Sequence, residues 1–378
     1  MARGDITQAQ GEEYRDEETG AVVRRLTGDG SDNHHLYFTS TSFVGEGEAV
    51  VFSSDRSGSS QLYMLEVGSG KIVQLTEAKE ASGLRACLDP GGRLFYFEGP
   101  ALRVLSLDVL DERELYRVPE GTRPGLPTCT ADGGYVAFAY VEDRAVSTET
   151  DRIYSTMAER YYQRPASVIM RVDTQSGDAV AAWGEHAWIS HVIIHPHRPD
   201  LILFCHEGGS SVKQRMWTVD LSVRVGREAQ PLFKQEHRES CCHEYFTQQG
   251  EVGFQCNVES EGEALSFNCF VRPDGTYLRQ FLLPGRRPGH MQSNSDNTLV
   301  VGDRGHLGPD DEEGGRYMSL MTHANGRAQV RRLCRHDTSG TQQIGHAHPI
   351  FSPDDRWVMF TSDAGGKCNV YMADVTSI

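Results

Sequence analysis

The sequence predicts an all-β protein, a seven-bladed β-propeller closed by an N-terminal strand and carrying one short helical insertion. Three observations support this prediction. Strand-like segments recur seven times, most of them continue in the same way, and the two ends of the chain carry complementary parts of one repeat. We therefore expect residues 1–378 to form a single domain.

Each of the seven segments follows a turn and has an apolar residue at its centre, as in "DPGGRLFYFEG" and "PDDRWVMFTSD". These anchor residues are Phe52, Phe97, Phe138, Phe204, Phe254, Val301 and Phe360. The shortest interval separates Phe97 from Phe138, and the longest separates Phe138 from Phe204. Most intervals are close to the repeat length of about 40–50 residues that is typical of propellers with four strands in each blade.

The two ends of the chain complete each other. Most units continue with a second strand and a glycine turn into a third, as in "QLYMLEVGSGKIVQLTE", but the last unit stops at "NVYMADVTSI" and lacks its outer strand. The segment "ETGAVVRRLTG" (residues 18–28) matches that missing strand. Pairing of the two ends would remove an open sheet edge. A pair of β-sandwiches, the alternative architecture, would not predict this complementary truncation.

One unit is longer than the others, over residues 141–169. Within it, Ile153, Met157 and Tyr161 recur at helical spacing, so we expect a helical insertion. Such an insertion is either a lid over one face or a surface decoration.

Composition excludes several classes of protein. The formal net charge of -16 argues against a nucleic-acid partner, because phosphate binding requires a basic surface. The N-terminal stretch has no signal-peptide core, and no run of about 18 apolar residues occurs, so we expect a cytoplasmic protein that does not enter a membrane. The 9 cysteines show no CxxC spacing, which favours reduced, mostly buried thiols. No obligate protein partner is evident.

Four histidines precede the anchors of four consecutive units at nearly equal distances along the chain. They are His191 before Phe204, His243 before Phe254, His290 before Val301 and His348 before Phe360. The first strand of every propeller blade lines the central channel. We therefore expect the four imidazoles at about the same height on the channel wall.

The stretch "TQQIGHAHPIFSPDD" contains the candidates for a metal site. If it is extended, His346 and His348 point to the same side. Gln343 can reach that side from the preceding loop, and His290 comes from the neighbouring blade. Three nitrogens and one amide oxygen suit a divalent ion that keeps open positions for water or substrate.

A second pair, His195 and His197, has the same spacing but falls at a turn. We expect this pair to be exposed and to bind nothing, because spacing alone does not make a metal site. Position relative to the channel distinguishes the two pairs.

A second group of candidates lies in the preceding units. The segment "ESCCHEYF" places His243 on a first strand, with Glu244 pointing the opposite way. Arg215 lies on the following element of the previous blade, and the segment "FCHEGG" places His206 nearby. A neutral histidine near a metal and an arginine can act as a general base toward a bound anion. The alternative is that His243 only hydrogen-bonds within its blade.

These motifs resemble those of the oligogalacturonate lyases, a family of bacterial cytoplasmic seven-bladed propellers of pectin degradation. The resemblance extends over nearly the whole chain and includes "HHLYFTSTSF", "LILFCHEG", "ESCCHEYF", "GHMQSN" and "QIGHAHPIFSPDD". It implies that a divalent metal, Mn²⁺ above all, is bound by His290, Gln343, His346 and His348. It also implies that His243 is the catalytic base and that Arg215 contacts the substrate and stabilises charge; we expect His191 and His206 to contribute to substrate binding.

The implied reaction is β-elimination on short oligogalacturonides. The ion would bind a uronate carboxylate, His243 would remove the adjacent C5 proton, and the glycosidic oxygen at C4 would leave, so that one product carries a 4,5-unsaturated uronate. A cation and an arginine would offset the charge that develops during proton removal. No nucleotide or organic cofactor is required.

Two other functions are open at this point. The first is a related lyase or isomerase acting on another uronate-containing oligosaccharide, which would need the same carboxylate-binding ion. The second is a non-catalytic propeller that binds a partner and whose channel histidines are structural. The second gives no reason for gathering four imidazoles, a glutamine and an arginine at one channel mouth.

Overall fold

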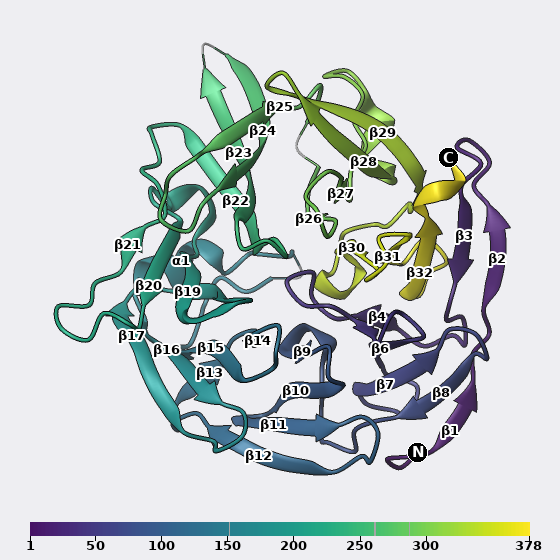
Figure 1. The fold of residues 1–378 in the computed structure, drawn as a ribbon, viewed down its shortest axis with the longest axis horizontal. Helices are drawn as coiled ribbons and strands as arrows, with labels where there is room; N and C mark the ends of the chain where they lie inside the picture. Colours follow the sequence, from purple (N-terminus) through teal and green to yellow (C-terminus); the bar gives the residue numbers. More distant parts are fainter. Residues whose placement is uncertain (151, 261, 287) are drawn as a thin grey trace.

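The structure is a computed structural model and describes residues 1–150, 152–260, 262–286 and 288–378. It consists of β-strands and one short α-helix, so the expectation of an all-β protein is confirmed. Figure 1 shows the sheets arranged around a central axis, with β9 (Ala86–Leu88), β26 (Met291–Ser293) and β30 (Ile350–Phe351) near the centre. Among the described residues, no helix has the length and apolar character needed to cross a membrane.

The described strands form six hydrogen-bonded sheets, and the first three come from the N-terminal half. The first contains β1 (Ile6–Gln8), β8 (Lys71–Gln74), β7 (Gln61–Glu66), β6 (Ala49–Ser54) and β4 (Asn33–His35), with β5 (Phe43–Val44) on β6. The second contains β12 (Glu112–Arg117), β11 (Ala101–Ser106), β10 (Arg93–Glu98) and β9. The third contains β17 (Ala179–His186), β16 (Ala166–Asp173), β15 (Tyr135–Glu142) and β13 (Thr122–Pro124), with β14 (Thr128–Cys129) on β15.

The other three sheets come from the C-terminal half and the N-terminal segment. The fourth contains β21 (Gln230–Pro231), β20 (Met216–Asp220), β19 (Arg198–His206) and β18 (Ile189–His195). The largest contains β22 (Glu239–Phe246), β23 (Val252–Ser260), β24 (Glu263–Val271) and β25 (Arg279–Leu282), then β29 (Arg327–Arg335), β28 (Tyr317–Ala324), β27 (Val300–Gly302) and β26. The sixth contains β2 (Glu12–Arg15), β3 (Val22–Arg25), β32 (Asn369–Asp374), β31 (Trp357–Ser362) and β30.

The largest sheet consists of two antiparallel units. They meet through one parallel pair, Leu282 of β25 with Arg327 of β29, whereas every other pairing in this sheet is between antiparallel neighbours. Within the described residues, four connections carry short 3-10 helices, η1 (Gly83–Arg85), η2 (Gly209–Ser211), η3 (Glu312–Arg316) and η4 (Gln343–Gly345), and η5 (Val375–Ser377) follows the last strand.

The seven anchor residues predicted from the repeat occupy equivalent places. They lie on β6, β10, β15, β19, β23, β27 and β31, and each is 2% exposed or less. Neighbouring units pack through apolar side chains, so that Leu62 of β7 and Leu94 of β10 belong to one buried cluster. Cysteines contribute to these cores: seven of the nine are buried, which confirms the expectation of mostly buried thiols.

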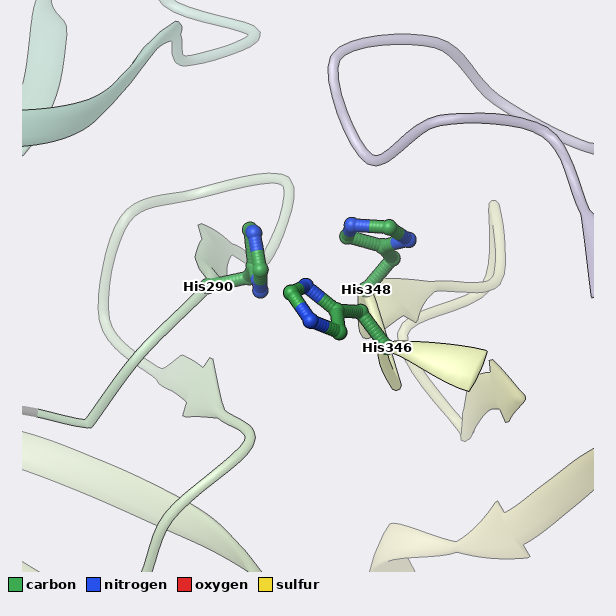
Figure 2. A group of neighbouring side chains, drawn as sticks. All are labelled: His290, His346 and His348. Atoms are coloured by element: carbon green, nitrogen blue, oxygen red, sulfur yellow. The ribbon is translucent and has the colours of Figure 1, made fainter. Parts of the chain in front are cut away.

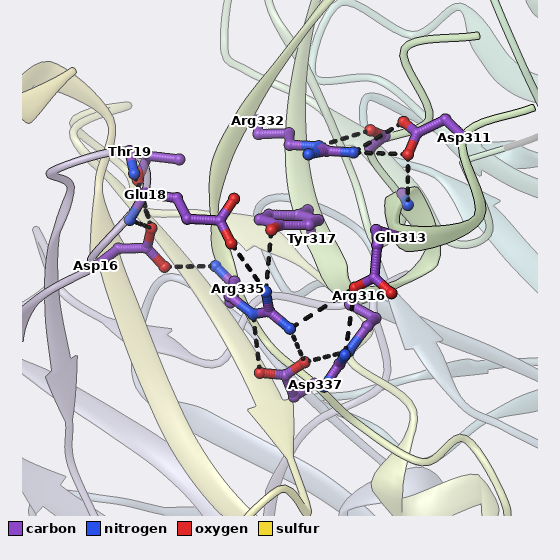
Figure 3. A network of polar contacts seen from close by, with 12 residues as sticks. Asp16, Glu18, Thr19, Asp311, Glu313, Arg316, Tyr317, Arg332, Arg335 and Asp337 are labelled. Carbon is purple, nitrogen blue, oxygen red and sulfur yellow. Dashed lines mark hydrogen bonds and ion pairs between the residues drawn. The ribbon is translucent and has the colours of Figure 1, made fainter.

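The N-terminal segment joins the sheet that contains the C-terminus. Val23 of β3 pairs with Ala373 of β32. Arg335 of β29 holds the same segment, because its backbone N–H donates to Asp16 Oδ2 at 2.8 Å and its Nη1 donates to Glu18 Oε1 at 2.9 Å (Figure 3). Strand β1, which the repeat does not predict, pairs instead with β8 of the first sheet.

The insertion is shorter than expected. Strand β15 continues to Glu142 and β16 begins at Ala166, so strands take up both ends of the predicted interval 141–169. Within it, α1 (Met157–Gln163) starts after Ile153 and contacts η2, which lies between β19 and β20 of the fourth sheet. One residue of the predicted interval, Asp151, lies outside the described residues.

Candidate active site

Three of the predicted metal ligands meet near the centre of the molecule. His290 lies directly before β26, and His346 and His348 lie between η4 and β30. Each offers a ring nitrogen, and these nitrogens lie within 4.8 Å of one another. The ring centroid of His290 is 4.3 Å from that of His348 and 5.4 Å from that of His346 (Figure 2). The structure thus brings together side chains that are more than fifty positions apart in the sequence.

Hydrogen bonds orient two of these imidazoles. His290 Nδ1 lies 2.8 Å from Asp303 Oδ2, so this nitrogen carries the proton and Nε2 carries the lone pair. His346 Nε2 donates to the Gly340 carbonyl at 3.2 Å. His346 Nδ1 is buried and has no hydrogen-bond partner in the described part of the chain. A buried acceptor left in this way is costly unless a ligand occupies it, which is what a metal ion would do.

Burial keeps the cluster neutral. It lowers the pKa of His290 and of His348 well below the usual range, and the neighbouring imidazoles lower both further. Burial also lowers the pKa of His346. Neutral imidazole is the form that binds a metal, because the lone pair is then available.

Gln343 lies beside the three imidazoles, as predicted, but its amide also contacts the insertion. Its Nε2 is 3.4 Å from His348 Nε2, and its Oε1 accepts a hydrogen bond of 2.8 Å from the Tyr154 hydroxyl. Turning the amide by half a rotation would direct Oε1 toward the histidines and Nε2 toward the Tyr154 oxygen, which can also accept. Gln343 can therefore supply an oxygen ligand without losing Tyr154.

The backbone is strained at three of the predicted site histidines. His191, His243 and His348 have φ of 46°, 57° and 47°, in the left-handed region that favours glycine. The pairing of β18 and of β22 is irregular at His191 and His243. Each such residue costs about 1–3 kcal/mol, and such bulges redirect side chains next to functional sites. Regular alternation along a strand does not predict these directions.

His243 lies next to the three clustered imidazoles. Its ring centroid is 4.3 Å from that of His290, and its Nδ1 is 3.3 Å from Gln255 Oε1. The Gln255 amide is itself fixed, because its Nε2 donates to the Gly289 carbonyl. Gln255 thus favours the tautomer with the proton on Nδ1 and the basic lone pair on Nε2.

Arg215 lies in a buried ion-pair cluster. Its Nε is 3.0 Å from Glu244 Oε2, and its Nη1 is 3.1 Å from Glu207 Oε1. Burial alone would raise the pKa of Glu244, but the charge of Arg215 and the contact with His191 outweigh it, so this pKa lies well below the usual range. The pKa of Glu207 is lowered for the same reason, with Arg215 outweighing burial. Both carboxylates are therefore ionised, and they orient the guanidinium.

The two other predicted substrate-binding histidines differ in position. His191 adjoins the ion-pair cluster, with Nδ1 3.3 Å from Glu244 Oε1, and its ring lies 5.7 Å from that of Tyr37. His206 Nε2 lies 2.8 Å from Glu185 Oε1, and its ring lies 5.1 Å from Trp217. His206 is thus held between β17 of the third sheet and β20 of its own, fourth sheet.

The second histidine pair is only partly as predicted. His197 is exposed, but His195 is buried, which contradicts the expectation of an exposed pair. Its Nδ1 accepts the backbone N–H groups of His197 and Arg198, so it closes the turn. Burial lowers its pKa to about 4.

Several residues around the cluster were not singled out from the sequence. The buried ring of Tyr37 lies 4.8 Å from His348 and 6.3 Å from His290. Phe38 stacks on His348 at 6.2 Å. Asp303 and Tyr154 act through hydrogen bonds to His290 and Gln343. The segment "HHLYFTSTSF" was noted only as part of a motif, and no spacing rule connects these residues with the histidines.

Fold and site together define a class of protein. The chain is an all-β protein with a mostly buried cluster of neutral imidazoles, a carboxylate behind one of them and an additional imidazole alongside. This donor set fits a divalent metal ion, because nitrogen ligands and a hydrogen-bonded carboxylate behind them are typical of such sites.

Comparisons with known proteins identify the family. The sequence profile of the oligogalacturonate lyases matches residues 1–378, so the chain belongs to the oligogalacturonate lyase family and is a lyase. An oligogalacturonide lyase of Pectobacterium atrosepticum is 28% identical over 99% of this chain and 98% of its own length.

Solved structures agree with this assignment. An oligogalacturonate lyase in complex with manganese has a TM-score of 0.87 at 28% identity, covering 99% of this chain and 98% of its own. A crystal structure of an oligogalacturonate lyase from Vibrio parahaemolyticus has a TM-score of 0.86 at 27% identity and covers 99% of both chains.

Proposed function

We propose that this protein is a metal-dependent lyase that cleaves short oligogalacturonides by β-elimination and releases 4,5-unsaturated uronates for pectin catabolism. The observation that carries the proposal is the orphaned Nδ1 of His346 among buried neutral imidazoles, with His243 beside them. The names of the matched relatives support the substrate class. We expect the enzyme to act in the cytoplasm.

The proposed architecture is a single domain over residues 1–378 with seven blades. The seven antiparallel units and the contacts between successive inner strands, such as β14 with β18 and β18 with β22, support it. Strand β3, paired with β32, would close the ring. The inner strands would then line a channel in which equivalent positions converge.

We propose His290, His346, His348 and Gln343 as the metal ligands. The matched structure in complex with manganese supports Mn²⁺ as the ion. When bound, the ion supplies a positive charge that binds the uronate carboxylate and makes the adjacent C5 proton more acidic. Asp303 orients His290, and the neutral state of the imidazoles keeps their lone pairs available.

His243 is the proposed base. With the proton on Nδ1, its Nε2 accepts the C5 proton of the substrate. The electron pair of the C5–H bond forms the C4–C5 double bond, and the C4–O bond breaks with its electrons on the glycosidic oxygen. That oxygen leaves as a sugar hydroxyl by taking up a proton from water, and His243 returns the C5 proton to solvent. Imidazole suits this step at neutral pH, because its unperturbed pKa of about 6.5 is close to the working pH.

Arg215 is the proposed substrate-contacting cation. A guanidinium has five N–H donors, and the two carboxylates that hold it use three of them in the bonds described. Glu244 and Glu207 fix its orientation, so a substrate oxygen meets a donor that does not need to reorganise. We expect His191 to assist at the same end of the site, whereas the contacts of His206 do not favour its role in substrate binding.

The decisive experiment follows the ultraviolet absorbance of the conjugated C4–C5 double bond. Metal-free protein is mixed with digalacturonate, and Mn²⁺ is then added. We expect absorbance to rise only after the metal is added, and not with His243→Ala. Absence of a rise in the metal-loaded wild-type protein would refute the proposed function.

A further inference from the structure

A cavity lies between the insertion and the third and fourth sheets, and His191 is one of the residues that line it. Its volume is about 270 Å³. We call it the arginine cavity and define it by Arg85, Arg123, Arg144, Arg160, Trp188 and His191. His191 connects it to the candidate active site, because the same ring lies 5.7 Å from Tyr37 and Tyr37 lies 4.8 Å from His348.

The charge of the arginine cavity is opposite to that of the molecule. Four arginines line it, and the carboxylate in its wall is that of Glu142, so the formal charge of the lining is three positive with His191 counted as neutral. The whole chain carries -16. A polyanionic sugar is repelled by most of this surface, and a local positive cavity both attracts it and holds it.

Two of the four arginines have carboxylate partners and two do not. Arg123 Nε lies 2.6 Å from Asp143, and Arg144 Nη2 lies 2.8 Å from Glu142. Within the described residues, no ion pair involves Arg85 or Arg160. Arginines without an ion-pair partner that line a common space are suited to bidentate binding of a carboxylate.

Trp188 adds an apolar surface to this space. Arg160 lies over its indole ring at 5.9 Å, and Arg160 Nε donates to Thr156 Oγ1 at 3.2 Å, so the arginine is held in place from both sides. An indole beside fixed cationic donors suits a pyranose ring that has apolar C–H groups and one carboxylate.

We propose that the arginine cavity is a second carboxylate subsite, which binds the uronate on the other side of the cleaved linkage. This inference rests on the proposed function and specifies its substrate: each of the two sugars that flank the cleaved bond must carry a free carboxylate. The clustered histidines receive the sugar that loses its C5 proton, and Arg85 and Arg160 bind the carboxylate of the leaving sugar. Binding there positions the linkage without taking part in proton removal.

The test compares Arg85→Gln and Arg160→Gln with the wild-type enzyme on digalacturonate in Mn²⁺. We expect each substitution to raise KM about tenfold and to lower kcat much less, because the lost contact exists before and during the reaction. Arg224→Gln is the matched control, since Arg224 is an exposed arginine on the β20–β21 connection, and should leave KM unchanged. Equal melting temperatures in circular dichroism would exclude misfolding.

Failure of the subsite and failure of the proposed function give different results. A wild-type KM in both arginine variants, with normal wild-type turnover, would overturn the subsite alone. If the wild-type enzyme does not cleave digalacturonate, calorimetric titration with the same sugar decides the matter: about tenfold weaker binding to both variants supports the subsite, and unchanged binding refutes it.

Discussion

Asp303→Asn tests whether the carboxylate behind His290 supports metal binding. The substitution keeps the shape of the side chain and an oxygen that can accept from His290 Nδ1, but removes its negative charge. In the structure, Nδ1 and Oδ2 are 2.8 Å apart, a distance typical of a charge-assisted hydrogen bond. His290 is 7% exposed and Asp303 is 9% exposed, so solvent screens the interaction only weakly.

The expected loss follows from this geometry. A carboxylate behind a ligating histidine fixes the ring and raises its basicity, and removing such a partner typically weakens metal affinity about 10- to 100-fold, or about 1.4–2.7 kcal/mol. We expect a loss within this range, because Asp303 Oδ2 is the carboxylate oxygen that contacts His290 Nδ1. The other oxygen, Asp303 Oδ1, has no hydrogen-bond partner among the described residues, so the effect of the substitution should come from the contact with His290.

The assay is calorimetric titration of the metal-free protein with Mn²⁺. Asp374→Asn is the control, because Asp374 is also buried but pairs with Arg356 in another part of the protein. It should leave Mn²⁺ affinity unchanged even if it lowers the melting temperature. Wild-type affinity in Asp303→Asn would show that the carboxylate does not support a metal-bound His290, and the ligand assignment of His290 would lose its main structural argument.

Three further predictions concern the base, the insertion and stability. His243→Ala should abolish turnover and leave bound Mn²⁺, measured by atomic absorption, unchanged, whereas His348→Ala should lose the metal. Tyr154→Phe removes the hydroxyl oxygen that would accept from Gln343 Nε2 once Oε1 faces the metal, and should weaken Mn²⁺ binding by about two- to tenfold in calorimetry. Burial lowers the pKa of His34 to about 4, so this imidazole takes up a proton on unfolding below about pH 6.5. Its contribution to the free energy of unfolding should therefore fall by about 2 kcal/mol from pH 7 to pH 5. Urea unfolding at both pH values should show a smaller decrease for His34→Gln than for the wild-type protein.

The repeat made the fold class predictable. Anchors such as Phe97 and Phe254 recur because every unit must bury the same strand against its neighbours, and this requirement leaves a period in the sequence. The limits of the insertion were less predictable. The pairing of β15 with β16 continues to Val141 and Ser167, inside the predicted insertion. The sequence pattern there does not predict a strand.

The site was predictable where it follows the repeat. His290 and His348 were found from their distances to the anchors, and His243 from the same rule. The prediction of an exposed His195 failed, because the spacing that places a residue at a turn does not show whether its ring folds inward to accept backbone N–H groups. Spacing also does not predict the ion pairs of Arg215, because its carboxylate partners, Glu207 and Glu244, come from two different parts of the chain.

The sequence by itself determined the all-β class, the family and which histidines are candidates for the site, because periodic burial and short motifs are local properties of the chain. Tertiary structure alone decided which groups orient those imidazoles. Asp303 faces His290 across a strand pair, Tyr154 reaches Gln343 from an insertion almost two hundred residues away, and four arginines from three parts of the chain meet in one cavity. Contacts of this kind depend on the directions in which bulges and loops point side chains, and the sequence repeat does not predict those directions.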